Sequence, residues 1–174
     1  MRNNPAAFVT FGDWSIDPAR FWTKVEKRSP MECWHWLGYV GQNGYGQFGI
    51  RTGGKTVART AHRVAYLLAR GDFPVEYSID HMCHNRRCVN PAHLRAIPQK
   101  NNCENHSGPT ARNNTGVRGV SRRGRYFDIA VKHNGVLHRA YGFTDLAAAE
   151  RAVIALRNSL WTHNDIDRQE TANA

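Results

Sequence analysis

The chain has 174 residues, a hydrophobic fraction of 41%, and 24 basic against 14 acidic residues, which give a net charge of +10. The length allows one domain or two small ones, and the composition excludes an intrinsically disordered chain. The charge favours a polyanion such as nucleic acid as the partner, because basic side chains cluster between residues 115 and 142.

The first thirty residues lack the apolar run of a signal peptide, and no stretch approaches the roughly 18 apolar residues of a membrane span. We therefore expect a soluble cytoplasmic protein without a membrane partner. In that compartment cysteines are reduced, which favours metal binding over disulfides for the four that the chain contains, Cys33, Cys83, Cys88 and Cys103.

Short elements are predicted through the first part of the chain. Residues 1–10 are expected to form a loose terminus, and residues 18–25 a helix capped by Asp17. Residues 43–50 open at an Asn-Gly turn and then alternate aromatic or apolar with small or polar side chains, which indicates a hairpin strand. A third strand is expected over residues 56–58.

A longer helix and another strand follow. Ala61–Arg70 has apolar residues at helical spacing and ends at Gly71, which is typical of a helix C-terminus. Residues 75–79 have the character of a strand. Pro91 can open a helical turn that carries His93.

The segment after this strand has the spacing of a zinc site. Cys83, Cys88 and His93 follow one another at intervals of five residues, and a structural zinc ion prefers four sulfur or nitrogen ligands in a tetrahedron. The fourth ligand must come from elsewhere. Cys33, beside two bulky tryptophans, is the first candidate; Cys103 is the alternative, and His106 is a weaker one.

Asp80 and His81 stand directly before this loop, which would hold both side chains in a fixed geometry. A neutral histidine can take a proton from water near pH 7, so His81 is a candidate general base for phosphodiester hydrolysis. Asp80 and Asn102 offer the oxygen ligands that a catalytic Mg²⁺ (or Mn²⁺) ion prefers. Zinc would then serve only as the scaffold.

Residues 101–114 are rich in Asn, Gly, Ser and Pro, which is typical of a linker, and we predict a boundary there between domains 1–108 and 109–174. The second domain should contain strands over 115–122, 126–133 and 136–141, the last two joined by an Asn-Gly hairpin turn. A helix over residues 145–160 with Thr144 as its N-cap should complete the domain.

The first domain resembles the HNH nucleases common in phage genomes and, more narrowly, the His-Cys box branch of homing endonucleases. The likeness covers residues 20–102. It implies a ββα-metal core in which the strand of His81 pairs with a second strand and a helix carries Asn102. It also implies His81 as general base, Asp80 and Asn102 as ligands of the catalytic cation, and Cys33 as the fourth zinc ligand. The residues that carry the resemblance are Asp80, His81, Cys83, Cys88, Asn90, Pro91, His93, Leu94 and Asn102.

Two details qualify the resemblance to the HNH nucleases. The last histidine of the family's motif is absent, since Asn102 is followed by Cys103 and Glu104. Arg63, on the helix before the site, is a candidate for steadying the scissile phosphate, and a surface role on an amphipathic helix is an equal alternative.

Residues 113–162 resemble the APETALA2-type DNA-binding domain, chiefly through the run Gly116-Val117-Arg118-Gly119-Val120. The resemblance implies that a three-stranded sheet enters the major groove and that basic strand residues contact bases and phosphates. The candidates for these contacts are Arg118, Arg122, Arg123, Arg125, Lys132 and Arg139.

The sequence therefore predicts an α+β protein in which a zinc-stabilised ββα-metal nuclease core precedes a small three-stranded antiparallel sheet and one helix. The predicted function is metal-dependent cleavage of double-stranded DNA by a phage or homing-type HNH endonuclease, in the host cytoplasm if a phage encodes it. A non-catalytic, zinc-stabilised, sequence-specific DNA-binding protein is the alternative. RNA cleavage stays open, as does a homodimer that would cut both strands. A chain ending near Gly108 is expected to cut with relaxed sequence preference.

Overall fold

The computed structural model describes residues 8–105, 108–109 and 111–172. The chain divides into two compact units, residues 1–98 and residues 99–174. Both combine antiparallel sheets with few helices, so the predicted α+β class is confirmed. No helix in the described part of the chain is long and apolar enough to cross a membrane.

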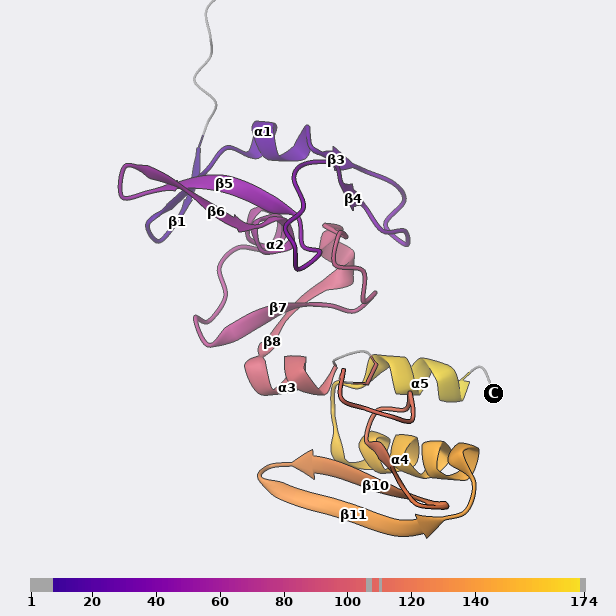
Figure 1. Cartoon of the computed structure of the whole chain (residues 1–174). Helices are drawn as coiled ribbons and strands as arrows, with labels where there is room; N and C mark the ends of the chain where they lie inside the picture. Colours follow the sequence, from indigo (N-terminus) through magenta and orange to yellow (C-terminus); the bar gives the residue numbers. More distant parts are fainter. Residues whose placement is uncertain (1–7, 106–107, 110, 173–174) are drawn as a thin grey trace, which may run out of the picture. The chain divides into compact units, whose positions relative to one another are not determined.

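The first unit contains three small sheets (Figure 1). One has four strands in the order β1-β2-β5-β6, and the other two are the pairs β3-β4 and β7-β8. The elements are β1 (Val9–Phe11), β2 (Trp14–Ile16), α1 (Pro18–Trp22), β3 (Val25–Glu26), β4 (His35–Trp36), β5 (Gln47–Thr52), β6 (Lys55–Thr60), α2 (Ala61–Arg70), β7 (Tyr77–His81), the 3-10 helix η1 (Pro91–His93) and β8 (Leu94–Pro98).

The N-terminal elements differ from the prediction in extent. Val9–Phe11 pairs with β2 as a strand, where a loose terminus was expected. Asp17 caps α1 as predicted, since its carboxylate accepts from Arg20 N at 2.9 Å. The helix ends at Trp22 and not at residue 25, because Val25 is buried in β3, where it pairs with Trp36.

The hairpin and the long helix of the first unit lie where the pattern predicts them, with one shift. Residues 42–44 form a turn and Gly46 forms a bridge with Val40, so β5 begins at Gln47 and pairs with β6 through the Gly53–Gly54 turn. The helix α2 spans the predicted residues and ends at Gly71, whose φ of +85° suits glycine.

The core of this unit is aromatic. Phe21 packs against Trp36 and Phe48, with ring centroids 5.2 and 5.1 Å apart. Gly46 lies so close to the Trp36 ring that an added Cβ would stand 2.4 Å from Cδ1, so only glycine fits there. This packing fixes β4 and the segment just before it, which carries Cys33.

The second unit is a three-stranded sheet in the order β11-β10-β9, with α4 on one face (Figure 1). Val120, Ile129 and Val131 of the sheet bury against Ala149 and Val153 of the helix. The elements are α3 (Gln99–Glu104), β9 (Val120–Arg123), β10 (Tyr126–His133), β11 (Val136–Phe143), α4 (Leu146–Leu160) and α5 (Asp165–Ala172).

In the second unit one predicted detail is confirmed and two are corrected. The hairpin turn has positive φ at Asn134 (48°) and Gly135 (82°), as a type I′ turn requires. The N-cap of α4 is Asp145, which accepts from Ala148 N at 2.9 Å, and not Thr144. The first strand begins at Val120 and not at residue 115, because the Asn113 side chain donates to the carbonyls of Val117 and Val120 and holds a loop.

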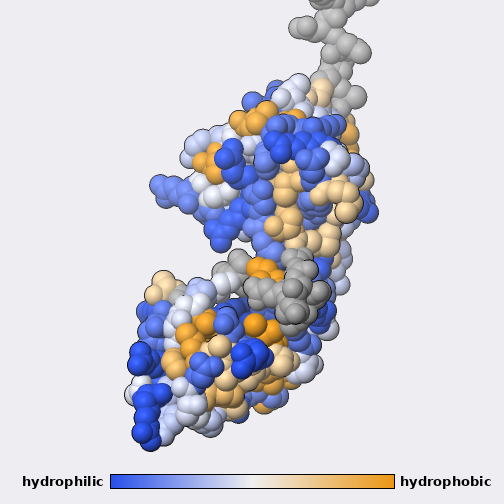
Figure 2. Space-filling model, turned by 90° about the vertical axis from the view of Figure 1, so that its right-hand side faces the viewer, coloured by the Kyte–Doolittle hydropathy of each residue, from blue (hydrophilic) through white to orange (hydrophobic). Residues whose placement is uncertain are grey.

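The predicted linker over residues 101–114 also contains structure. Residues 99–104 form α3, and the division between the two units falls between residues 98 and 99, before this helix. The helix α5 was not predicted at all. In the view of Figure 2, hydrophilic and hydrophobic side chains are interspersed on both units.

Candidate metal centre and nuclease site

Backbone pairing brings the Cys33 segment to the loop that carries the other three candidate ligands. His35 forms an antiparallel bridge with Cys88, Trp36 N donates to Arg87 O at 3.0 Å, and Val89 N donates to Trp34 O at 2.9 Å. The two segments are therefore joined on both sides of Cys88. This contact joins residues more than fifty positions apart in the sequence.

Asn90 is the second link between these segments. Its side chain is 1% exposed, and its Nδ2 donates to Pro30 O at 2.9 Å and to Glu32 O at 2.7 Å. Its Oδ1 accepts from Ala92 N at 2.9 Å and caps η1, the turn that presents His93. One amide thus aligns the chain before Cys33 with the turn of His93.

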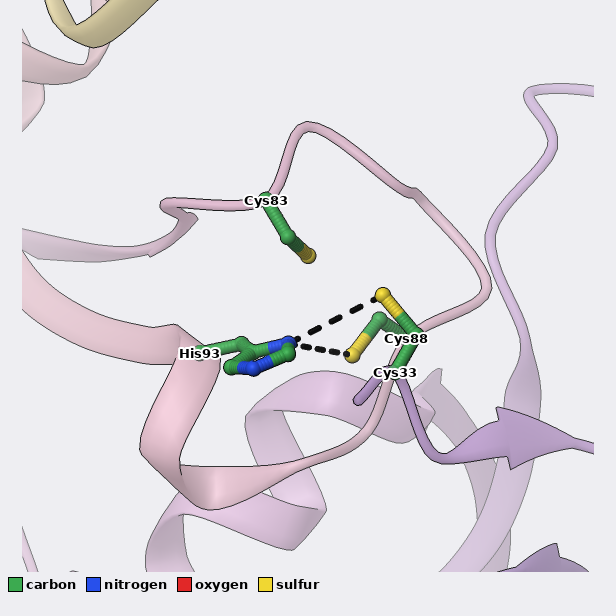
Figure 3. A group of neighbouring side chains, drawn as sticks. All are labelled: Cys33, Cys83, Cys88 and His93. Atoms are coloured by element: carbon green, nitrogen blue, oxygen red, sulfur yellow. Dashed lines mark hydrogen bonds between the residues drawn. The ribbon is translucent and has the colours of Figure 1, made fainter. Parts of the chain in front are cut away.

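The four side chains converge on a common point (Figure 3). The sulfur atoms of Cys33, Cys83 and Cys88 and a ring nitrogen of His93 all lie within 4.8 Å of one another. His93 Nδ1 is 3.7 Å from the sulfurs of both Cys33 and Cys88. Bonds of about 2.0–2.3 Å to a tetrahedral zinc ion put ligand atoms roughly 3.5 Å apart, so this Cys₃His cluster could hold zinc.

The three thiols differ in how readily they lose a proton. Cys83 accepts a hydrogen bond from the Cys88 thiol, which lowers the pKa of Cys83 to about 4. The same bond raises the pKa of Cys88, and burial raises the pKa of Cys33. One thiolate therefore forms readily, and a divalent cation would supply the charge needed to ionise the other two.

Cys33 takes the fourth position in the cluster. Cys103 is exposed on α3 in the second unit, where its sulfur accepts from Gln99 Nε2 at 3.7 Å. His106 lies outside the described residues. Cys33 is the residue that completes the cluster.

His81 ends β7 and is held by the loop that carries Cys83 and Cys88. Its Nε2 lies 3.0 Å from the carbonyl oxygen of Cys88, and because a carbonyl only accepts, Nε2 carries the proton. Nδ1 then bears the lone pair that a general base requires. Burial lowers the pKa of His81, which is 6% exposed, so the ring is neutral near pH 7.

His62 is a residue that the sequence reasoning missed. It lies on the buried face of α2, with its ring centroid 4.5 Å from that of His81, and Tyr45 packs 5.2 Å from His62 and 5.9 Å from His81. Burial lowers the pKa of His62 well below its usual value. A histidine set between the apolar residues of an amphipathic helix was the available signal.

Asp80 is buried beside His81 and already has a cationic neighbour. Arg95 Nε donates to Asp80 Oδ2 at 2.9 Å, and a second guanidinium nitrogen lies 2.9 Å from the same oxygen. The two residues are directly opposite in the antiparallel β7-β8 pair. A strand paired with the His81 strand was implied by the HNH resemblance, and β8 provides it.

The remaining predicted nuclease residues lie on helices. Arg63 projects from α2 with its guanidinium carbon 4.7 Å from the Phe73 ring centroid and 5.5 Å from that of Trp14, at the wall of a cavity of about 350 Å³. Asn102 lies on α3, as the resemblance implied, but this helix belongs to the second unit.

The predicted DNA-contact residues of the second unit separate into two groups. Lys132 lies opposite Leu137 and next to Val131 in β10, so it faces away from α4, as does Arg139, which lies opposite Ala130. Arg123, opposite Tyr126, is on this same outer face and is 82% exposed, although its Nε lies 3.3 Å from Asp128 Oδ2.

The other three predicted arginines make contacts within the unit. Arg118 donates to backbone carbonyls and stacks on Trp161, with 4.6 Å from its guanidinium carbon to the ring centroid. Arg122 shares the α4 side with Phe127 and donates to Gly124 O at 3.1 Å. Arg125 lies over the Tyr126 ring, 4.8 Å from its centroid.

Comparison with known proteins agrees with this geometry. Residues 59–103 match the family model of the HNH endonucleases. The matched segment begins in β6, contains α2, the β7-β8 pair and the metal loop, and ends in α3. This segment is thus similar to an HNH endonuclease domain, which supports a nuclease.

The similar curated proteins come from phages. Protein 7.7 of Escherichia phage T7 is 29% identical over 137 residues, covering 76% of this chain and 98% of the relative. The uncharacterized gene 5.3 protein of Enterobacteria phage T3 is 36% identical over 61 residues, covering 34% of this chain and 60% of the relative. Protein 2.8 of phage T7 is 36% identical over 70 residues, covering 40% and 45%. No solved structure matches the chain.

Proposed function

We propose that this protein is a metal-dependent DNA endonuclease of the HNH type, of phage or homing origin, acting in the host cytoplasm. The observation that carries the proposal is the state of His81: a buried, neutral imidazole whose Nε2 is fixed by the Cys88 carbonyl within the matched segment. A purely structural finger has no need of a histidine beside its ligand set that leaves a lone pair unused.

In this proposal His81 Nδ1 takes the proton from the attacking water. Asp80 and the amide of Asn102, both within the matched segment, supply oxygen ligands to a single Mg²⁺ or Mn²⁺ ion. When bound, that cation neutralises charge on the phosphate oxygens and supports the leaving 3′ oxygen. Arg63 contacts the phosphate. Zinc on Cys33, Cys83, Cys88 and His93 keeps the Cys88 carbonyl, and through it His81, in place.

The substrate in this proposal is double-stranded DNA, read by the outer face of the β9-β10-β11 sheet. Arg123, Lys132 and Arg139 share that face with exposed Leu137 and Tyr141, which is a suitable mixture for phosphate and base contacts. We leave out Arg122, which lies on the α4 side of the sheet, and Arg118, whose guanidinium is bonded to the end of α3.

The test is incubation of the purified protein with supercoiled plasmid, with and without Mg²⁺ or Mn²⁺, beside His81→Ala. We expect nicking or linearisation that requires both the cation and His81, while zinc content and plasmid binding stay at the wild-type level. His35→Ala, a half-buried histidine on β4 that pairs with Glu26, is the matched control and should cut normally.

Two outcomes would contradict the proposal. Tight plasmid binding without cleavage under either cation would favour the non-catalytic DNA-binding protein. Loss of zinc in His81→Ala would make His81 structural. For the outer sheet face, Lys132→Ala combined with Arg139→Ala should weaken plasmid binding. The slope of log binding constant against log salt concentration should become smaller by about one to two. Unchanged binding would exclude that face.

A further inference from the structure

The helix α3 is held by residues that come much later in the chain. The Arg118 guanidinium donates through Nη1 to Glu104 O and through Nη2 to Cys103 O, both at 3.1 Å. These are the carbonyls at the end of α3, which a helix leaves without partners of its own. Stacking on Trp161 keeps the guanidinium in place.

Further contacts hold the other parts of α3. Asn101 Nδ2 lies 2.8 Å from Thr162 Oγ1 and 2.7 Å from His163 Nδ1, both in the segment after α4. Lys100 donates to Asn134 in the β10-β11 turn, and Glu104 lies 3.4 Å from Nδ1 of His133.

A six-residue helix needs such support, because isolated helices below about 12 residues are marginal in water. Three parts of the second unit supply it: the loop before β9, the β10-β11 turn and the segment after α4. Asn102 lies between the two anchored positions Asn101 and Cys103. The backbone position of Asn102 is therefore set by contacts within the second unit.

We infer that the rest of the second unit forms part of the nuclease machinery because it holds α3 in place. Within it, Arg118 positions Asn102 for the catalytic cation. This inference rests on the proposed function, in which Asn102 is a cation ligand. The DNA-reading sheet and the cation-binding helix then belong to one folded unit. A chain ending near Gly108 should lose cleavage, contrary to the expectation from the sequence.

The experiment uses the full-length chain and compares Arg118→Met, Asn102→Ala, the double variant and wild type. Plasmid cleavage is measured over a range of Mg²⁺ concentrations, with zinc content and plasmid binding as controls. In Arg118→Met we expect the cleavage rate to fall by up to about ten-fold. The Mg²⁺ concentration that gives the half-maximal rate should rise, as in Asn102→Ala. Arg151→Met, an exposed arginine on α4, is the matched control and should behave as wild type.

The double variant separates positioning from general stability. If Arg118 acts through Asn102, adding Arg118→Met to Asn102→Ala should change the rate little further, because the two effects are coupled. A purely structural effect of Arg118 would lower the amount of active protein, leave the Mg²⁺ dependence unchanged, and add to that of Asn102→Ala.

The outcomes distinguish this inference from the proposed function. If wild type does not cut, the proposed function fails and the inference fails with it. If wild type cuts and Asn102→Ala needs more Mg²⁺, but Arg118→Met keeps the wild-type Mg²⁺ dependence, only the inference is overturned. If Arg118→Met does not fold, Thr162→Val with His163→Phe removes the acceptors of Asn101 and should raise the Mg²⁺ requirement in the same way; an unchanged requirement overturns the inference.

Discussion

Residues 8–98 spread their strands over three small sheets around a Cys₃His cluster, whereas residues 99–174 form one sheet covered by one long helix. In the first unit the decisive contacts join segments distant in sequence, such as the bridge between His35 and Cys88. In the second, neighbouring strands pair through short turns, and a buried Arg157–Asp167 ion pair anchors α4 to α5. A structural metal should therefore be essential to the folding of the first unit and not needed for the folding of the second.

Removal of zinc should produce the largest difference between the units. We expect a strong chelator to unfold the first unit, since structural zinc contributes on the order of 10 kcal/mol to small domains, and to leave the second folded. Four of the five tryptophans lie in the first unit and Trp161 lies in the second, so tryptophan fluorescence mainly reports the first unit. Amide exchange in β10 reports the second. Simultaneous loss of both signals would show that the second unit also depends on zinc.

Asp167→Ala should have the next largest effect, and in the opposite unit. It leaves the guanidinium of Arg157, which is 3% exposed, without the carboxylate that it meets through two nitrogens. The expected loss in the free energy of unfolding of the second unit is about 3–5 kcal/mol. Urea unfolding followed at Trp161 measures it, with Glu150→Ala on the exposed side of α4 as control. Zinc content should not change; a loss of zinc would show that the units depend on each other.

A smaller effect concerns the pH dependence of the first unit. Burial, together with the neighbouring His81, holds the pKa of His62 well below its usual value. Below about pH 6.5 the unfolded chain takes up a proton there that the folded chain does not, so stability falls as the pH falls. His62→Gln should lose less stability than wild type between about pH 7 and pH 5.5, by about 1 kcal/mol.

Measuring both proteins by urea unfolding in the same zinc-containing buffer removes the pH dependence of zinc binding from the difference. Equal losses in the two proteins would mean that His62 takes up a proton in the folded state as readily as in the unfolded state.

The sequence predicted the elements whose information is local. The α2 helix has its apolar spacing and a terminal glycine, and the β10-β11 turn has Asn-Gly, so both lie where expected. The spacing of Cys83, Cys88 and His93 likewise identified three members of the cluster. The choice of Cys33 over Cys103 could not be made from spacing, because backbone pairing across more than fifty residues decides it.

The missed elements depend on tertiary contacts. The β1 and β2 strands are three residues each and form by pairing with each other and with β5. The residues of α3 have the polar composition of a linker, and the helix exists because Arg118 and the segment after α4 satisfy its polar groups. The sequence predicted Arg118 as a DNA contact because it lies in a basic segment. Nothing in the sequence indicates that its guanidinium binds carbonyls of the same unit.

The position of α3 has a consequence for exchanging recognition modules between nucleases. Composition alone would place the junction of a chimaera in the polar stretch 101–114, which would separate α3 from Arg118 and from the Thr162–His163 segment. A junction between Pro98 and Gln99 transfers the helix together with the residues that hold it. A donor module would then bring its own equivalent of Asn102, so under the proposed function module exchange would replace part of the catalytic apparatus as well as the target preference.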